Sequence, residues 1–89
     1  MKSISLDLTK MTSLPTLHRY LHQALALPEY YGCNLDALYD CLTEISEPTQ
    51  LTVPAAVQRE EYLGWYGQQL ITVLQEAAAA NASLQVIVA

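Results

Sequence analysis

Three short strand-like runs, separated by long stretches with helical spacing of apolar residues, constrain the fold of this chain most strongly. Residues 3–6 (Ser-Ile-Ser-Leu) alternate polar and apolar side chains, residues 50–53 form a second run, and residues 84–88 are almost all apolar. The alternation is typical of a half-buried strand, and the last run is typical of a parallel strand covered by helices. Strands that are joined through helices predict right-handed crossovers and a parallel sheet.

The stretch that follows the first run predicts a helix. Thr12 or Ser13 can cap its first turn, and the helix must end before Pro28 because the residue before a proline avoids the helical conformation. Apolar residues recur between these limits at intervals of three and four. We expect the following residues to face the core: Leu14, Leu17, Leu21, Ala24 and Leu25.

Three further helices are expected. The second, capped by Asn34, runs from about Leu35 to Ile45; the third opens at Pro54 and ends near Leu63; the longest follows a break at residues 64–67 (Gly-Trp-Tyr-Gly). Asn81 is expected in the left-handed conformation that ends many helices. The predicted fold class is therefore α/β, with a small three-stranded parallel sheet packed with about four helices.

Length and charge restrict what the chain can do. At 89 residues it can bury roughly 60–65% of its unfolded surface, which is enough for one modest core and one domain, residues 1–89. Nine acidic residues against four Lys and Arg give a net charge of −5. Because phosphate contacts require clustered basic residues, this balance argues against binding to nucleic acid or to an anionic membrane surface.

The two cysteines are expected to be free thiols. Cys33 and Cys41 are eight residues apart on or beside one helix, about 12 Å along its axis, and a disulfide requires Cα atoms within about 7 Å. No signal peptide and no apolar span is visible in the sequence. These observations predict a cytoplasmic protein with Cys41 in the core and Cys33 near the surface.

The predicted second helix carries an acidic face. Asp36, Asp40 and Glu44 follow one another at intervals of one helical turn, and no Lys or Arg occurs between Arg19 and Arg59. Like charges at this spacing destabilise a helix by roughly 0.2–0.5 kcal/mol per pair. An acidic face that is preceded by a tyrosine-rich loop indicates a surface for a positively charged partner.

Structural and enzymatic interpretations of the same residues stand beside this one. Asp36 lies near the second helical position, where a carboxylate stabilises the helix dipole without a partner, and Asp40 can be a solvated acid. His18 and His22 share a helix face, but Arg19 occupies the place of the glutamate in a His-Glu-x-x-His zinc helix. We expect no metal, no cofactor and no enzymatic activity; a small carboxylate-based or metal-binding enzyme is the alternative.

The most distinctive part of the chain comprises residues 25–32 (Leu-Ala-Leu-Pro-Glu-Tyr-Tyr-Gly), 34–38 (Asn-Leu-Asp-Ala-Leu) and 40–43 (Asp-Cys-Leu-Thr). Together with Glu76-Ala77 near the end of the last helix, these residues closely resemble the barstar family, the intracellular inhibitors of barnase-type ribonucleases. The resemblance extends over nearly all 89 residues, with strands and helices in the same order. It implies a single barstar-like domain.

The resemblance also implies a mode of binding, in which the second helix and the loop before it fill the active site of the ribonuclease. Asp40 would enter the pocket of the scissile phosphate, Asp36 would contact basic residues, and Tyr30 would pack as an aromatic anchor. The implied binding residues are Tyr30, Tyr31, Gly32, Asn34, Leu35, Asp36, Tyr39, Asp40, Thr43 and Glu76. The implied partner is a basic, barnase-like ribonuclease of the extracellular type, and the chain is expected to be a monomer or to form a 1:1 complex. A different basic protein is the other binding hypothesis.

Four positions at or beside this surface depart from the barstar pattern. Tyr39 and Ile45 stand where barstar carries tryptophan, Glu44 replaces a glycine, and Cys33 replaces an acidic residue. The central carboxylates are present. We therefore expect the inhibitory mode to be shared and these four positions to influence the choice of target.

Overall fold

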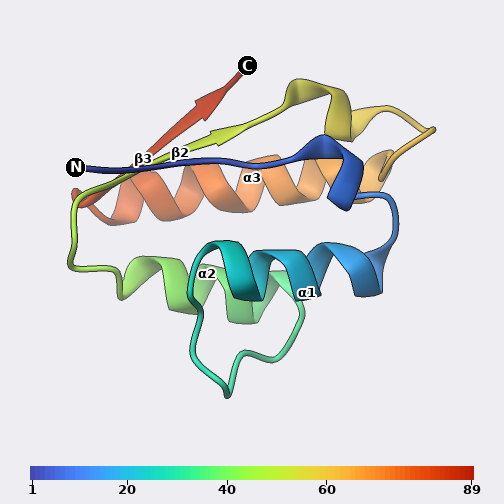
Figure 1. Cartoon of the computed structure of the whole chain (residues 1–89). Coiled ribbons are helices and arrows are strands. Elements are labelled where there is room, and N and C mark those ends of the chain that lie inside the picture. Colours follow the sequence, from blue (N-terminus) through green and yellow to red (C-terminus); the bar gives the residue numbers. More distant parts are fainter.

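The computed structural model describes all 89 residues and contains one parallel sheet and three α-helices (Figure 1). The strands, in the order β1-β2-β3 across the sheet, are β1 (Lys2–Ser5), β2 (Thr49–Val53) and β3 (Leu84–Val88). The helices are α1 (Leu14–Ala24), α2 (Leu35–Thr43) and α3 (Trp65–Ala80). The predicted α/β class with three parallel strands is confirmed. None of the helices combines the length and the apolar character needed to span a membrane.

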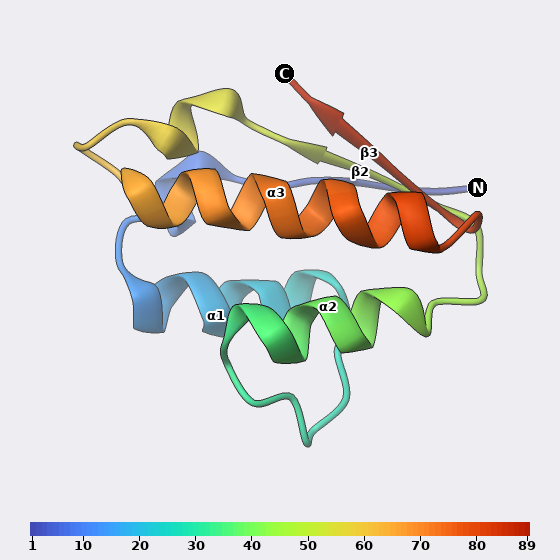
Figure 2. The ribbon, with the colours of Figure 1, turned by 180° about the vertical axis from the view of Figure 1, so that it is seen from behind.

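The helices cover one face of the sheet and leave the other face open, as both views of the ribbon show (Figures 1 and 2). On β2, Leu51 is fully buried, whereas its neighbour Gln50 lies in register between Ser3 and Gln85 and is half-buried. The expectation that β3 is covered by helices is therefore correct for one face only. Ile87 is 41% exposed because β3 is an edge strand whose second face meets solvent.

The core lies between the covered face of the sheet and the three helices. Its largest fully buried side chains are Met11, Leu17, Leu21, Leu38, Leu42, Leu51, Leu70, Leu74, Val53 and Val57. The predicted core face of α1 is confirmed for Leu17, Leu21 and Leu25, but Leu14 is 45% exposed. Leu14 is the first residue of the helix and lies at its outer end, whereas Met11, in the turn before it, is fully buried.

The third predicted helix does not form as an α-helix. Residues 54–63 contain only the short 3₁₀ helix η2 (Ala55–Gln58), and turns follow it. Arg59 ends η2 with an extended backbone (φ −72°, ψ 147°), which interrupts the helical hydrogen-bond pattern. The number of α-helices is therefore three and not four.

Helix α3 begins before Gly67 and not after it. Gly64 precedes the helix with φ 53°, and Trp65 is the first helical residue. Gly67 lies inside α3, where a Cβ atom would be 2.1 Å from the carbonyl oxygen of Val57. This glycine therefore permits the close approach of α3 to η2 and does not interrupt the helix.

Asn81 ends α3 in an extended conformation (φ −137°, ψ 108°), so the predicted left-handed conformation is wrong. Its Nδ2 donates hydrogen bonds to the carbonyl oxygens of Leu42 and Ile45, both at 2.9 Å, and its Oδ1 accepts one from the backbone N–H of Ser83 at 3.0 Å. The last carbonyl groups of a helix have no partner within it. Asn81 supplies one for α2 and thereby connects the ends of two helices.

Candidate partner-binding site

Helix α2 begins with a capped first turn. The Oδ1 of Asn34 accepts a hydrogen bond from the backbone N–H of Ala37 at 2.8 Å, and its Nδ2 donates one to the carbonyl oxygen of Gly32 at 3.2 Å. The predicted N-cap is confirmed, and the same side chain also fixes the end of the preceding loop. Asp36 lies exposed in the first turn, where the helix dipole favours a carboxylate.

Helices α2 and α3 together form an acidic groove with a volume of about 310 Å³. The groove is lined by Leu35, Asp36, Tyr39, Asp40, Val73 and Glu76. Two carboxylates come from α2 and the third comes from α3, so residues far apart in the sequence contribute to one surface. The apolar side chains between them give the groove the mixed character of a protein-binding site.

No basic residue of the chain neutralises these three carboxylates. The ion pair that the structure contains joins Arg59 to Glu61 at 3.5 Å, and both side chains are exposed. With nine acidic residues against four Lys and Arg in the whole chain, the groove carries an uncompensated negative potential. This charge is available to a partner.

Tyr30, in the loop before α2, is 76% exposed. Glu44, the C-cap residue of α2, carries a carboxylate whose charge raises the pKa of the Tyr30 hydroxyl. An exposed aromatic ring next to an acidic helix provides apolar contact area together with a polar tip. Such side chains carry much of the binding energy in many protein interfaces.

The other predicted binding residues differ in their surroundings. Gly32 and Asn34 are exposed in the loop. Tyr31, by contrast, is only 6% exposed, and its hydroxyl forms a hydrogen bond with Nδ1 of His18 at 2.6 Å. Thr43 is half-buried and donates to the carbonyl oxygen of Asp40 at 2.9 Å, within its own helix. Tyr31 therefore lies beneath the surface that the other residues form, whereas Thr43 is half-buried as Leu35 and Tyr39 are.

Two residues that contribute to this region, Val73 and Tyr66, were not predicted from the sequence. Val73, which is half-buried on α3, lines the acidic groove beside Glu76. The spacing of Val73 and Glu76 indicates that both belong to one surface, because residues three apart on a helix share a face. Tyr66 was also missed; its hydroxyl lies 2.8 Å from Nε2 of His18, and the two residues are 48 positions apart.

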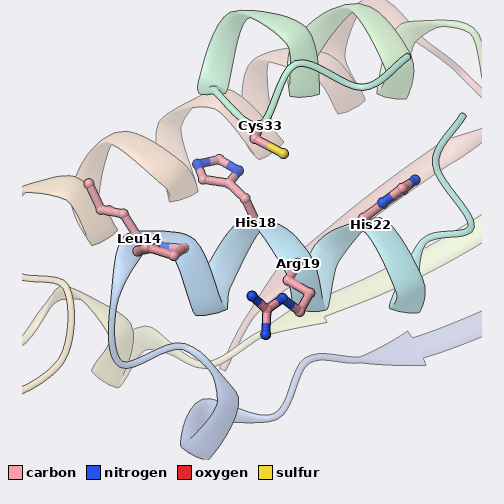
Figure 3. A pocket seen from close by; sticks show the side chains of 6 residues that line it. Leu14, His18, Arg19, His22 and Cys33 are labelled. Carbon is pink, nitrogen blue, oxygen red and sulfur yellow. The ribbon is translucent and has the colours of Figure 1, made fainter. Parts of the chain in front are cut away.

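A second hollow, of about 530 Å³, opens over α1 and is lined by Leu14, Pro15, His18, Arg19, His22 and Cys33 (Figure 3). Both cysteines are free; Cys33 is exposed and Cys41 is buried, as expected. No three His, Cys, Asp or Glu side chains in the chain are arranged to hold a metal ion.

Comparison with known proteins places the chain in a family. Residues 1–88 match the family described as Barstar (barnase inhibitor), and the chain belongs to this family. One relative is the Bacillus subtilis (strain 168) protein named "Putative ribonuclease inhibitor YrdF". The two chains are 37% identical over 78 residues, which cover 86% of each. The resemblance inferred from the loop and the second helix is thus confirmed at the level of the family.

Proposed function

We propose that this chain is a non-enzymatic ribonuclease inhibitor that binds its target through the acidic groove and the loop before α2. The observation that carries the proposal is the convergence of Asp36, Asp40 and Glu76 on one groove without a basic residue to neutralise them. A ribonuclease must bind RNA phosphates and therefore presents basic residues, which three carboxylates complement. Membership of the barstar family and the name of the Bacillus subtilis relative support this proposal.

In the proposed complex, the inhibitor blocks the active site of a barnase-like ribonuclease in place of RNA. Asp40 occupies the position of the scissile phosphate and pairs with the basic groups that would bind it. Asp36 and Glu76, which line the same groove from two helices, accept hydrogen bonds from a further basic side chain. Tyr30 packs against the partner outside this charged centre. An interface of this kind buries about 800 Å² on each partner.

Three of the four residues that depart from the barstar pattern lie in or around this centre, whereas the fourth, Ile45, packs against the core. Tyr39 lines the groove, Glu44 stands beside Tyr30, and Cys33 is exposed in the loop. They contribute shape and charge at the periphery, while Asp36 and Asp40 remain at the centre. We therefore assign the choice of target ribonuclease to these peripheral positions and the inhibitory mode to the central carboxylates.

Co-expression tests the proposal directly. Each member of a panel of toxic barnase-like ribonucleases is expressed with the wild-type chain, with Asp40→Ala or with Glu60→Ala, and growth is scored. Glu60 is an exposed carboxylate outside the groove, so it controls for the loss of one negative charge. We expect rescue by the wild type and by Glu60→Ala, and loss of rescue with Asp40→Ala at equal protein levels. Equal rescue by both variants contradicts the site; no rescue of any ribonuclease favours a different basic partner.

A further inference from the structure

His18 lies between two tyrosine hydroxyl groups that come from different parts of the chain. Its Nδ1 is 2.6 Å from the hydroxyl of Tyr31, and its Nε2 is 2.8 Å from the hydroxyl of Tyr66. His18 is on α1 and only 4% exposed, Tyr31 belongs to the loop before α2, and Tyr66 is in the first turn of α3. We call this arrangement the Tyr31–His18–Tyr66 bridge. It connects the loop to two helices.

Few other hydrogen bonds hold the backbone of this loop, apart from the one that Asn34 donates to the carbonyl oxygen of Gly32. Between residues 28 and 33, the one backbone N–H that donates to a backbone carbonyl is that of Tyr31, which bonds to Pro28 at 3.0 Å. The ribbon shows the loop extending away from the helices on the side opposite the sheet (Figures 1 and 2). Tyr31 is the buried side chain of this segment, and its neighbours Tyr30 and Gly32 are exposed.

We propose that His18 and Tyr66 are positioning residues for partner binding, which hold the loop before α2 in the conformation that the partner meets. This inference rests on the proposed function. Neither residue lines the acidic groove, so each acts through Tyr31. A loop that is already ordered in the free protein avoids the entropic cost of ordering on binding, and therefore binds more tightly.

The chemistry of the imidazole makes the bridge sensitive to protonation. A neutral ring has one donor and one acceptor nitrogen, and each hydroxyl can play the complementary role. A protonated ring donates from both nitrogens, so the hydroxyl that had donated to it must accept instead and point its own hydrogen elsewhere. Neither tyrosine hydroxyl has another hydrogen-bond partner, so that hydrogen is left without an acceptor and the bridge is weakened. The hollow beside His18 contains Arg19 and His22 of α1 and Cys33 of the loop, and α3 contributes Tyr66 (Figure 3). No carboxylate is present there to favour the charged ring.

The first test compares Tyr66→Phe with Tyr62→Phe, because Tyr62 is a half-buried tyrosine of the same region that is not part of the bridge. Affinity for a ribonuclease that the chain neutralises is measured at pH 7.5, where all proteins are folded. We expect Tyr66→Phe to bind about three- to tenfold more weakly, the range for one hydrogen bond, and Tyr62→Phe to bind like the wild type. Equal affinities of both variants and the wild type would overturn the positioning role.

The second test is the pH profile of binding. His18→Gln and His22→Gln are compared with the wild type against the same ribonuclease between pH 5 and 8, so that titration of the ribonuclease itself cancels. The ring of His22 also lies 6.0 Å from that of Tyr31, centroid to centroid, but forms no hydrogen bond with it, so His22→Gln controls for a neighbouring imidazole outside the bridge. We expect the affinity of the wild type and of His22→Gln to fall, relative to His18→Gln, as the pH decreases below about 6.5. A purely structural His18 would leave the three profiles parallel, and that result would contradict the inference.

The third test needs no ribonuclease. Amide hydrogen exchange of residues 29–34 is measured in the free protein for the wild type, Tyr66→Phe and Tyr62→Phe. We expect exchange about three- to tenfold faster in Tyr66→Phe alone. Faster exchange in this variant supports the positioning role even if the chain binds no ribonuclease, a result that would count against the proposed function only. Unchanged exchange overturns the inference whatever the binding experiments give.

Discussion

At the scale of single residues, the side chain of Asn81 connects the ends of two helices through hydrogen bonds. Its amide donates to two carbonyl oxygens at the end of α2 and accepts from the backbone of Ser83. We expect Asn81→Ala to lower the free energy of unfolding by about 1–3 kcal/mol, because the carbonyl of Ile45 and the N–H of Ser83 lose their partner and the carbonyl of Leu42 keeps only weaker backbone bonds. Urea denaturation measures this change.

Asn81→Asp separates the hydrogen bonds that the amide donates from the one that it accepts. A carboxylate can still accept from the N–H of Ser83, but it cannot donate to Leu42 and Ile45. We therefore expect Asn81→Asp to be destabilised at least as much as Asn81→Ala. An aspartate variant as stable as the wild type would show that the bonds to α2 contribute little.

At the scale of elements, the close contact between α3 and η2 requires a glycine at position 67. Alanine favours a helix over glycine by about 1 kcal/mol, so Gly67→Ala would stabilise α3 in isolation. In the protein, its Cβ would lie 2.1 Å from the backbone of Val57. We expect a net loss of about 1–3 kcal/mol in thermal or urea unfolding, the usual cost of overpacking, whereas Gln68→Ala on the exposed face remains near wild type. A stabilised Gly67→Ala would contradict this packing.

The elements that were predicted correctly are those whose signals are local. The strands and the first two helices follow from alternation, from spacing and from the cap at Asn34; Ser13 occupies the N-cap position of α1, but its side chain forms no capping hydrogen bond. Two of the errors, at Gly67 and Asn81, concern contacts with distant segments. Gly67 interrupts a helical pattern in the sequence, yet the reason for it is the carbonyl of Val57, and the backbone of Asn81 is set by its bonds to α2.

The residues of the candidate site likewise divide into those that a local sequence pattern indicates and those that it does not. Spacing alone placed Asp36 and Asp40 on one helix face, and both line the groove. Glu76 was assigned only through the resemblance to barstar, because no local pattern relates α3 to α2. The partners of His18 could not be predicted at all, since Tyr66 is 48 positions away and nothing in either sequence segment indicates the pairing.

At the scale of the whole molecule, the stability of the fold should depend on pH through His18. Burial lowers the pKa of its imidazole below the ordinary value of 6.5, so the unfolded chain binds the proton more readily than the folded one. The contribution of the neutral ring is therefore complete above about pH 6.5 and is lost as the pH falls through the lowered folded pKa. Urea unfolding between pH 5 and 8 should show this decline in the wild type and in His22→Gln, but not in His18→Gln. A decline of equal size in His18→Gln would contradict it.

The net charge of −5 has a second consequence at this scale. Attraction to a basic partner accelerates encounter and is screened by salt, whereas contacts in the formed interface are screened less. We expect the association rate with a ribonuclease that the chain inhibits to fall by at least about tenfold between 50 and 500 mM salt. The dissociation rate should change less. Stopped-flow kinetics measures both rates. An association rate independent of salt would contradict the electrostatic role of the groove.

Inhibition kinetics of RNA cleavage test the central claim most directly, that the acidic groove blocks a ribonuclease active site. Inhibition by the wild type should be competitive with RNA, and Glu60→Gln should have the same inhibition constant. Asp40→Asn, which keeps the shape and removes the charge, should raise that constant at least about 30-fold, corresponding to about 2 kcal/mol. This is the general range for interfacial charge pairs, of which the barnase–barstar complex is itself a standard example. Inhibition that is not competitive, or an unchanged constant for Asp40→Asn, would contradict the account.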